Sequence, residues 1–345
     1  MKKFITFNLF ISALIILNGC GAISTFNASG KDFKDRNNDN YNYENVVITK
    51  TSRSDVDKEV NNFALMAHFS NVVYRKDLGP KLTDSMGCDY DSQDIQYGMP
   101  KSNSSEWRRL PAWSNKGEGI ATCISKNGLH FETYAHFQNG PNNAPDQVVI
   151  AIRGTENGTL QDMFENWTAN FSAAFGFEPS EYKSIRNYAK ILITGLVDTY
   201  GANLEIYTTG HSLGGGMAQE LAFAFKKISA AYVFDTSPVT NWTAMVFDGL
   251  IENHDPNIYR VYEHHEFLSY ARFFSDRFTG KHVNRSDYEF FFTKTNPIKE
   301  HSMAIIACHL ANKMTSDDEK FNYSKDYAKS TLKDHRLCPA EILSN

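Results

Sequence analysis

The sequence has no excess of positive charge, no internal repeat and no apolar run that would cross a membrane comfortably. Its 345 residues hold 35 Lys and Arg against 40 Asp and Glu, for a formal net charge of −5. Because no basic stripe dominates, we expect no binding to nucleic acid. The apolar run at residues 4–17 is shorter than the roughly 20 residues of a transmembrane helix. With 41% hydrophobic residues, the chain can bury the core of one large α/β domain or two small domains.

The N-terminus has the pattern of a bacterial export signal. Lys2 and Lys3 precede the apolar run, and Leu17-Asn18-Gly19-Cys20 ends it. This end resembles the lipobox, in which a small residue precedes a cysteine that is lipidated. We therefore expect residues 1–19 to be a lipoprotein signal peptide and Cys20 to anchor the protein to a membrane of the bacterial cell envelope. Gly21 is typical of lipoproteins sent to the outer membrane. The alternative is an ordinary cleaved signal with an unrelated cysteine.

Polar composition separates this N-terminus from the folded domain. Residues 20–54 are rich in Asn, Asp, Ser and Lys, which predicts a lipidated N-terminus followed by a flexible tether. Residues 55–345 then form the folded domain. Four cysteines remain in that domain, and in an exported protein an even number favours disulfides. Of the three ways to pair them we favour Cys88–Cys123 and Cys308–Cys338, whose members are nearer in sequence.

Strand-like and helix-like patterns alternate along the domain. This alternation predicts an α/β fold with a mostly parallel central sheet covered by helices on both faces. The loop-rich segment 81–119 is either a cap pinned by a disulfide or a long insertion. The expected strands are 130–137, 147–152, 204–209, 230–235, 257–263 and a peripheral antiparallel strand, 287–294; the expected helices are 56–74 with Asp55 as N-cap, 182–200 with Gly201 as C-cap, 217–227 and 301–314.

The most informative motif is Gly210-His211-Ser212-Leu213-Gly214, which lies between a strand-like and a helix-like run. In that context G-x-S-x-G marks a nucleophile elbow, a sharp turn on which the serine hydroxyl stands clear of the sheet. Side chains at Gly210 and Gly214 would collide with the neighbouring strand and helix. The helix N-terminus aims backbone N–H groups at a developing oxyanion. The alternative is a glycine-rich turn that only packs a helix on a strand.

A serine nucleophile needs a base, and the base needs a carboxylate that orients it. In an elbow of this kind the acid and then the histidine follow the serine along the chain. The candidate acids at strand ends are Asp235, Glu263 and Glu266, and the candidate histidines are His254, His264, His265, His282, His301, His309 and His335.

Four segments in this order resemble the class 3 lipases, a family of the α/β-hydrolase superfamily that includes the fungal triacylglycerol lipases. The segments are 149–155 (VIAIRGT), which resembles the oxyanion strand of the family, Asn166-Trp167, the elbow at 210–215, and 233–238 (VFDTSP), which resembles a strand that ends in Phe-Gly-Ser-Pro. The resemblance covers roughly residues 55–314 and implies an α/β-hydrolase fold. The segment 81–119 has no counterpart.

The resemblance also implies roles for the partners of Ser212. His301 stands just before Ser-Met at a helix start, as in the final motif of the family, and His309 is the alternative base. The segment after Arg260-Val261-Tyr262 leads to Glu266 as the acid. Asp235 stands where the family commonly has glycine, and together with Glu263 it remains an alternative acid.

The same resemblance implies an oxyanion hole and a lid. The hole would be formed by Thr155 and by the backbone N–H of Leu213. Residues 160–177 lie where the family carries its lid and are rich in aromatic side chains, although these would equally suit a core. No cofactor and no metal is expected, since His264 and His265 lack a third ligand at a telling spacing.

We therefore expect a serine hydrolase that cleaves carboxylic esters of lipids, as a triacylglycerol lipase or carboxylesterase. A phospholipase of the A type, acting on membrane phospholipids, is the nearest alternative. A non-catalytic lipid-binding lipoprotein is the alternative of another class, and an amidase or thioesterase would use the same triad. The expected partners are a lipid or ester substrate and the membrane that holds Cys20.

Overall fold

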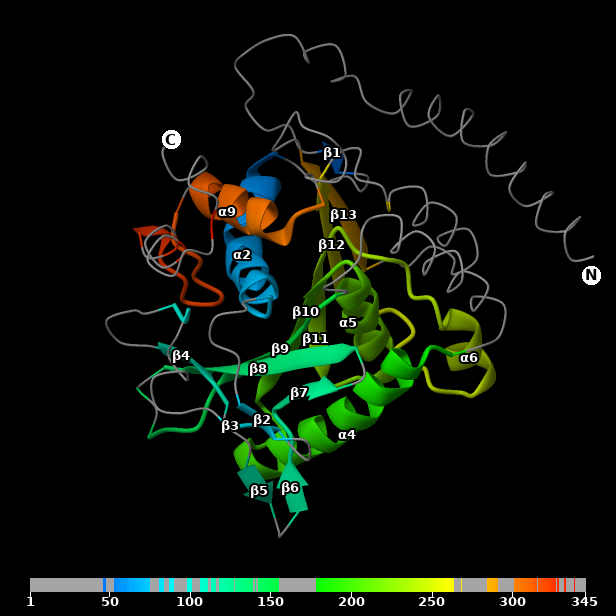
Figure 1. Ribbon diagram of the computed structural model, residues 1–345. Helices are drawn as coiled ribbons and strands as arrows, with labels where there is room; N and C mark the ends of the chain where they lie inside the picture. Colours follow the sequence, from blue (N-terminus) through cyan, green and yellow to red (C-terminus); the bar gives the residue numbers. More distant parts are fainter. Residues whose placement is uncertain are drawn as a thin grey trace, which may run out of the picture. The chain divides into compact units, whose positions relative to one another are not determined.

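A computed structural model describes most of the folded domain (Figure 1). It divides the chain into two compact units, residues 1–46 and 47–345. The expected signal peptide, Cys20, most of the tether, Thr155, the lid segment 160–177 and Glu266 lie outside the described residues. Those that are described are 46–47, 53–74, 81–83, 87–89, 98–100, 106–110, 113–115, 118–126, 128–138, 140, 142–154, 178–263, 268, 284–290, 301–314, 316–326, 328, 332 and 338.

A mostly parallel sheet forms the centre of the second unit. Its strands lie in the order β13-β12-β11-β10-β9-β8-β4, and β7 also pairs with β8. The five strands from β9 to β13 are parallel to one another, whereas β8 is antiparallel to β9. The strands are β4 (Glu106–Arg109), β7 (Cys123–Lys126), β8 (Leu129–Phe137), β9 (Gln147–Ile152), β10 (Glu205–His211), β11 (Ile228–Phe234), β12 (Ile258–Glu263) and β13 (Arg285–Phe290); β1 (Val46–Val47) is the first described strand. This architecture confirms the expected α/β-hydrolase type of fold.

Helices cover both faces of this sheet (Figure 1). They are α2 (Arg53–Val72) and α9 (Met303–Lys313) on one face, α4 (Ser180–Tyr200) and α5 (Leu213–Ala224) on the other, and the short α6 (Trp242–Phe247) after β11. Two successive residues of β10 have side chains that point to opposite faces of the sheet. Thr208 Oγ1 donates to a backbone carbonyl of α5, and Thr209 Oγ1 donates to a backbone carbonyl of α2. Strand side chains point alternately to opposite faces, so each face has its own core.

The two cores differ in composition. The core under α4 and α5 is mainly aliphatic and includes Val148, Ile150 and Ile152 of β9. The core under α2 and α9 is largely aromatic, with Phe63 of α2 against Tyr288 of β13 and Phe69 stacked on Tyr134. All six residues of β9 are buried, as expected for a strand covered on both faces.

The structure corrects three expectations about the elements. β13 is parallel to β12 and not antiparallel, because the connection 264–284 is long enough for a crossover, which needs a dozen or more residues. Helix α2 begins at Arg53, so Asp55 lies inside it and is not its N-cap. The segment 81–119 is not only loop: it holds β4 and two small antiparallel pairs, β2 (Lys81–Thr83) with β3 (Gly87–Asp89) and β5 (Trp113–Asn115) with β6 (Glu118–Ile120), which ends one residue beyond the segment.

Two other expectations are confirmed, the end of α4 and one of the two disulfides. Gly201 ends α4 with a positive φ of 94°, and its N–H donates to the carbonyl of Val197. Cys308 and Cys338 form a disulfide. Cys123 is also disulfide-bonded, and the side chain of Cys88, its expected partner, lies outside the described part of the chain. None of the helices that the structure describes is both long and apolar enough to cross a membrane.

Candidate active site

Ser212 lies at a sharp turn between β10 and α5. Its φ of 56° and ψ of −127° are unusual for a residue with a side chain, and such strain persists only where the surroundings hold it. The Ser212 N–H donates to the carbonyl of Phe234 at 3.1 Å, and the Ser212 carbonyl accepts from the N–H groups of Gly215 and Ser237, each at 3.0 Å. Backbone groups of α5 and of the segment after β11 thus fix the turn. This is the geometry that the elbow motif predicts.

Two glycines make the turn sterically possible. A Cβ atom at position 210 would overlap the backbone of Gly214, and a Cβ atom at position 214 would overlap the carbonyl oxygen of Ile152. Helix α5 therefore crosses so close to β9 and β10 that only a hydrogen atom fits at these positions. The expected steric reason for Gly210 and Gly214 is confirmed.

A histidine and a carboxylate lie together beside this turn. His301 is buried and stands two residues before α9. Its Nδ1 lies 3.7 Å from Oδ2 of Asp235, which is buried at the end of β11. The other oxygen of Asp235, Oδ1, accepts the Glu263 N–H at 2.8 Å. The carboxylate is thus held from β12 and faces His301.

The backbone of Asp235 explains a departure from the class 3 pattern. Its φ is 37°, in the left-handed region that favours glycine, and Asp is one of the few other residues that adopt this conformation readily. Asp235 therefore adopts a conformation that glycine adopts readily, while adding a carboxylate. Glu266, the first choice of acid from the sequence, lies outside the described residues.

Two further side chains, which the sequence pattern did not single out, reach the site. The Tyr74 hydroxyl, just after α2, lies 3.0 Å from Nδ1 of His211, and Nε2 of His211 lies 3.0 Å from the carbonyl oxygen of His301. The one available signal was that His211 occupies the variable position of the elbow motif directly before Ser212.

His211, Asp235 and His301 bring their ligand atoms within 4.8 Å of one another, close enough to raise the question of a metal site. However, both ring nitrogens of His211 are engaged by protein groups, and Nε2 faces a carbonyl oxygen, so Nε2 carries a proton. A protonated ring nitrogen does not coordinate a metal. The cluster suits proton transfer better than metal binding.

The surroundings of Ser212 also fit an oxyanion hole. Leu213 is the first residue of α5, and N–H groups in the first turn of a helix have no partner within the helix. On the other side, a Cβ atom added to Gly154 would lie 3.1 Å from Cβ of Ser212. The chain after β9 therefore passes directly beside the serine. Thr155, the expected second donor, is the next residue.

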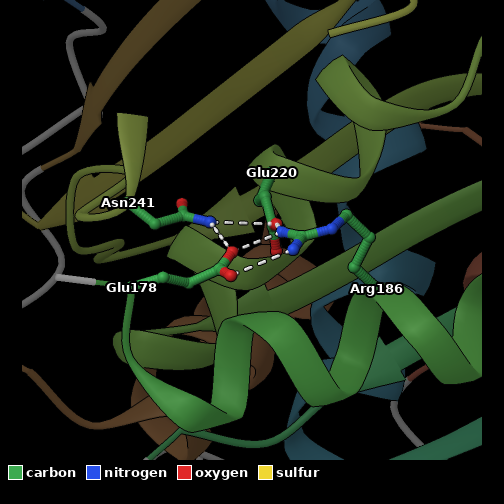
Figure 2. A network of polar contacts seen from close by, with 4 residues as sticks. All are labelled: Glu178, Arg186, Glu220 and Asn241. Atoms are coloured by element: carbon green, nitrogen blue, oxygen red, sulfur yellow. Dashed lines mark hydrogen bonds and ion pairs between the residues drawn. The ribbon is translucent and has the colours of Figure 1, made fainter. Parts of the chain in front are cut away.

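A partly buried polar network supports α5 behind the elbow (Figure 2). Arg186 of α4 binds both Glu178 and Glu220, and Asn241 Nδ2 donates to the same two carboxylates at 3.0 Å each. Glu220 lies on α5 and is fully buried, and this burial raises its pKa to about 7. The network joins the start of α4, helix α5 and the start of α6.

Comparison with known proteins identifies the family. Residues 66–261 match the Tle-like phospholipase domain, a phospholipase-like family. The chain belongs to this family. The matched segment covers more than half of the chain and includes Ser212 and Asp235. The expected resemblance is thus confirmed at the level of α/β-hydrolase lipases and phospholipases, but the narrower assignment to the class 3 lipases is not. These findings support a hydrolase of lipids or esters in general.

Two solved structures show a distant likeness. A mutant of MDLA from Penicillium cyclopium is 14% identical, with 71% of this chain and 83% of that chain covered and a TM-score of 0.37. A dienelactone hydrolase-like promiscuous phosphotriesterase from metagenomic libraries is 10% identical, with 70% and 98% covered and a TM-score of 0.31. No curated protein sequence matches the chain. The fold description therefore rests on the strand order of this chain itself.

Proposed function

We propose that this protein of the Tle-like phospholipase family is a serine hydrolase that cleaves the carboxylic ester bonds of membrane phospholipids. The observation that carries the proposal is the strained Ser212 turn with a buried histidine and carboxylate beside it. Among ester hydrolases of lipids, the family match favours phospholipids over triacylglycerols. The triacylglycerol lipase or carboxylesterase predicted from the sequence is therefore the second candidate.

The arrangement suggests a mechanism of the Ser-His-acid kind. His301 takes the proton of Ser212 while the serine oxygen attacks the ester carbonyl, and it then passes that proton to the leaving alcohol. A carboxylate at Nδ1, which is Asp235 in the described structure, stabilises the imidazolium. The N–H of Leu213 and a donor from Thr155 receive the oxyanion, each worth about 3 kcal/mol of barrier. Water then releases the fatty acid and restores Ser212.

The first test compares the full chain, purified in detergent, with its Ser212→Ala variant. Substrates are phosphatidylcholine vesicles, triacylglycerol emulsions and a series of acyl esters from short to long chains. We expect fatty acid release from the vesicles that is lost in the variant. Ser212-dependent turnover of triacylglycerol alone would favour the second candidate. No Ser212-dependent turnover of any ester would contradict the proposal and favour lipid binding without hydrolysis.

We also propose, from the sequence pattern at residues 1–20, that Cys20 is lipidated and holds the enzyme on the outer membrane. An anchor of several acyl chains binds a membrane much more firmly than a single chain. Expression of the full chain with and without Cys20→Ala in a Gram-negative host, followed by membrane fractionation and mass spectrometry of the N-terminal peptide, tests this. An unlipidated Cys20 in the mature protein would contradict it.

A further inference from the structure

Hydrogen bonds connect four separate segments of the chain around Ser212: the end of α2, the chain after β9, the end of β10 and the loop before α9. The Gly154 N–H, after β9, donates to the Tyr74 hydroxyl at 2.9 Å, and this hydroxyl lies 3.0 Å from Nδ1 of His211. Nε2 of His211 lies 3.0 Å from the carbonyl oxygen of His301. The side chains of Tyr74 and His211 therefore link the chain after β9, the end of β10 beside Ser212, and the loop that carries His301.

The direction of each of these hydrogen bonds follows from its chemistry. A carbonyl oxygen only accepts, so Nε2 of His211 donates to His301. Burial, and secondarily the nearby His301, hold the pKa of His211 well below its usual value. The ring is therefore neutral, and its Nδ1 accepts. The Tyr74 hydroxyl then donates to Nδ1 while it accepts the Gly154 N–H, so that His211 is held in one tautomer.

This single tautomer matters because the rings of His211 and His301 are close neighbours. Their centroids lie 4.6 Å apart, with an angle of 42° between the planes. A base that takes the serine proton becomes positively charged, and a second positive ring at this distance would oppose that step. A neutral His211 avoids the repulsion, and its Nε2–H fixes the backbone that carries the base.

We propose that Tyr74 and His211 are positioning residues that hold the backbone of His301 and the chain after β9 in place around Ser212. The inference rests on the proposed function, in which His301 is the base. Both residues act through other groups: His211 through the His301 carbonyl, and Tyr74 through the His211 tautomer and the Gly154 N–H.

The kinetic test is Tyr74→Phe, with Tyr207→Phe as matched control. Tyr207 is a buried tyrosine on the face of β10 that also carries His211. Its hydroxyl donates to Glu205 at 2.8 Å, away from the site. We expect Tyr74→Phe to lower kcat on phosphatidylcholine by about 10- to 100-fold, as a small misplacement of catalytic groups does, with little change in KM. Tyr207→Phe should leave both constants near those of the wild type. Equal kinetics of the two variants would overturn the inference.

Substitutions of His211 test the carbonyl contact by partial rescue. A glutamine amide places an N–H near the former Nε2 position, so His211→Gln can still donate to the His301 carbonyl, whereas His211→Leu cannot. We expect the kcat of His211→Gln to be at least about tenfold higher than that of His211→Leu, because a small misplacement of catalytic groups lowers kcat by about this factor or more. Equal losses in two variants that unfold at similar temperatures would overturn the role of this hydrogen bond.

Nuclear magnetic resonance of the ¹⁵N-labelled imidazoles gives a readout that does not need turnover. We expect the His211 signal, assigned by its loss in His211→Gln, to show a proton on Nε2 only and no titration between about pH 5 and 8, where an ordinary histidine titrates. A proton on Nδ1, or a titration in that range, would overturn the hydrogen-bond directions. A wild type without Ser212-dependent turnover would instead remove the proposed function, and the positioning role would fall with it.

Discussion

At the scale of single residues, the choice of acid depends on a backbone angle. Asp235 has a positive φ of 37°, and this conformation lets β11 end in a turn whose carboxylate faces His301. The sequence alone favoured Glu266, because the pattern of the resembling family places its acid after the next strand. What the sequence could not supply was the distance of 3.7 Å between Asp235 and His301, which depends on how β11 and α9 meet.

Replacing each candidate acid by its amide decides between them. Asn at position 235 tolerates positive φ, and its oxygen can still accept the Glu263 N–H, so Asp235→Asn should fold. If Asp235 orients the base, we expect kcat to fall by about 10²- to 10⁴-fold, as happens when the tautomer of a triad histidine is lost. Glu266→Gln should then retain most of the activity. The reverse pattern, with activity lost only in Glu266→Gln, would assign the acid to Glu266.

At the scale of elements, helix α5 is joined to its neighbours by a partly buried ionic network. Glu220 extends from α5 towards Arg186 of α4 and Asn241 before α6 (Figure 2). Buried charge networks stabilise only weakly, because desolvation offsets the attraction, but removing one partner is costly. The network therefore serves to fix α5 relative to α4 more than to increase stability.

The raised pKa of Glu220 predicts how stability depends on pH. Below about pH 4.5 the carboxyl is protonated in both states, and between 4.5 and about 7 only the folded state keeps the proton. Folding therefore loses stability as pH rises through this window, by up to about 3 kcal/mol from the size of the pKa shift. We expect the free energy of unfolding of wild type, minus that of Glu220→Gln, to fall over this range in urea titrations.

The test uses the difference in free energy of unfolding between wild type and variant, because other titrating groups change stability with pH in the opposite direction. His211, whose pKa is lowered, favours the unfolded state as pH falls below its usual value of about 6.5. That contribution cancels between wild type and variant. Glu252→Gln, at an exposed position, is the matched control for replacing one carboxylate by an amide. A flat difference for Glu220→Gln would contradict the prediction.

At the scale of the whole molecule, the sequence predicted the elements better than their spatial relations. Periodicity and turn residues located β9, β10 and α4, as Gly201 at the end of α4 shows. The predicted direction of β13 was wrong, because an alternating sequence pattern carries no information on which way a strand runs. The role of Tyr74 was missed, because an ordinary tyrosine after a helix gives no sign that it meets Gly154, 154 − 74 = 80 residues later.

The disulfide between Cys308 and Cys338 crosslinks the end of the domain that carries His301. It joins α9 to a segment 30 residues further along the chain, and a loop of this size contributes about 2 to 4 kcal/mol. We therefore expect Cys338→Ser to lower the thermal midpoint clearly, as measured by circular dichroism without reductant. Lys226→Ser, at an exposed position far from both cysteines in sequence, should not. An unchanged midpoint for Cys338→Ser would contradict a stabilising role.

The hydrogen bonds between the elbow and the His301 loop also have a consequence for the order of synthesis. Ser212 emerges from the ribosome 301 − 212 = 89 residues before His301, which is a delay of about 4 to 18 seconds at usual rates of translation. During this interval the elbow lacks His301 and the carbonyl that His211 binds. Under the proposed function, a nascent chain therefore cannot attack the membranes of the cell that makes it, and lipid hydrolysis begins only once the segment that carries His301 has been synthesised and folded.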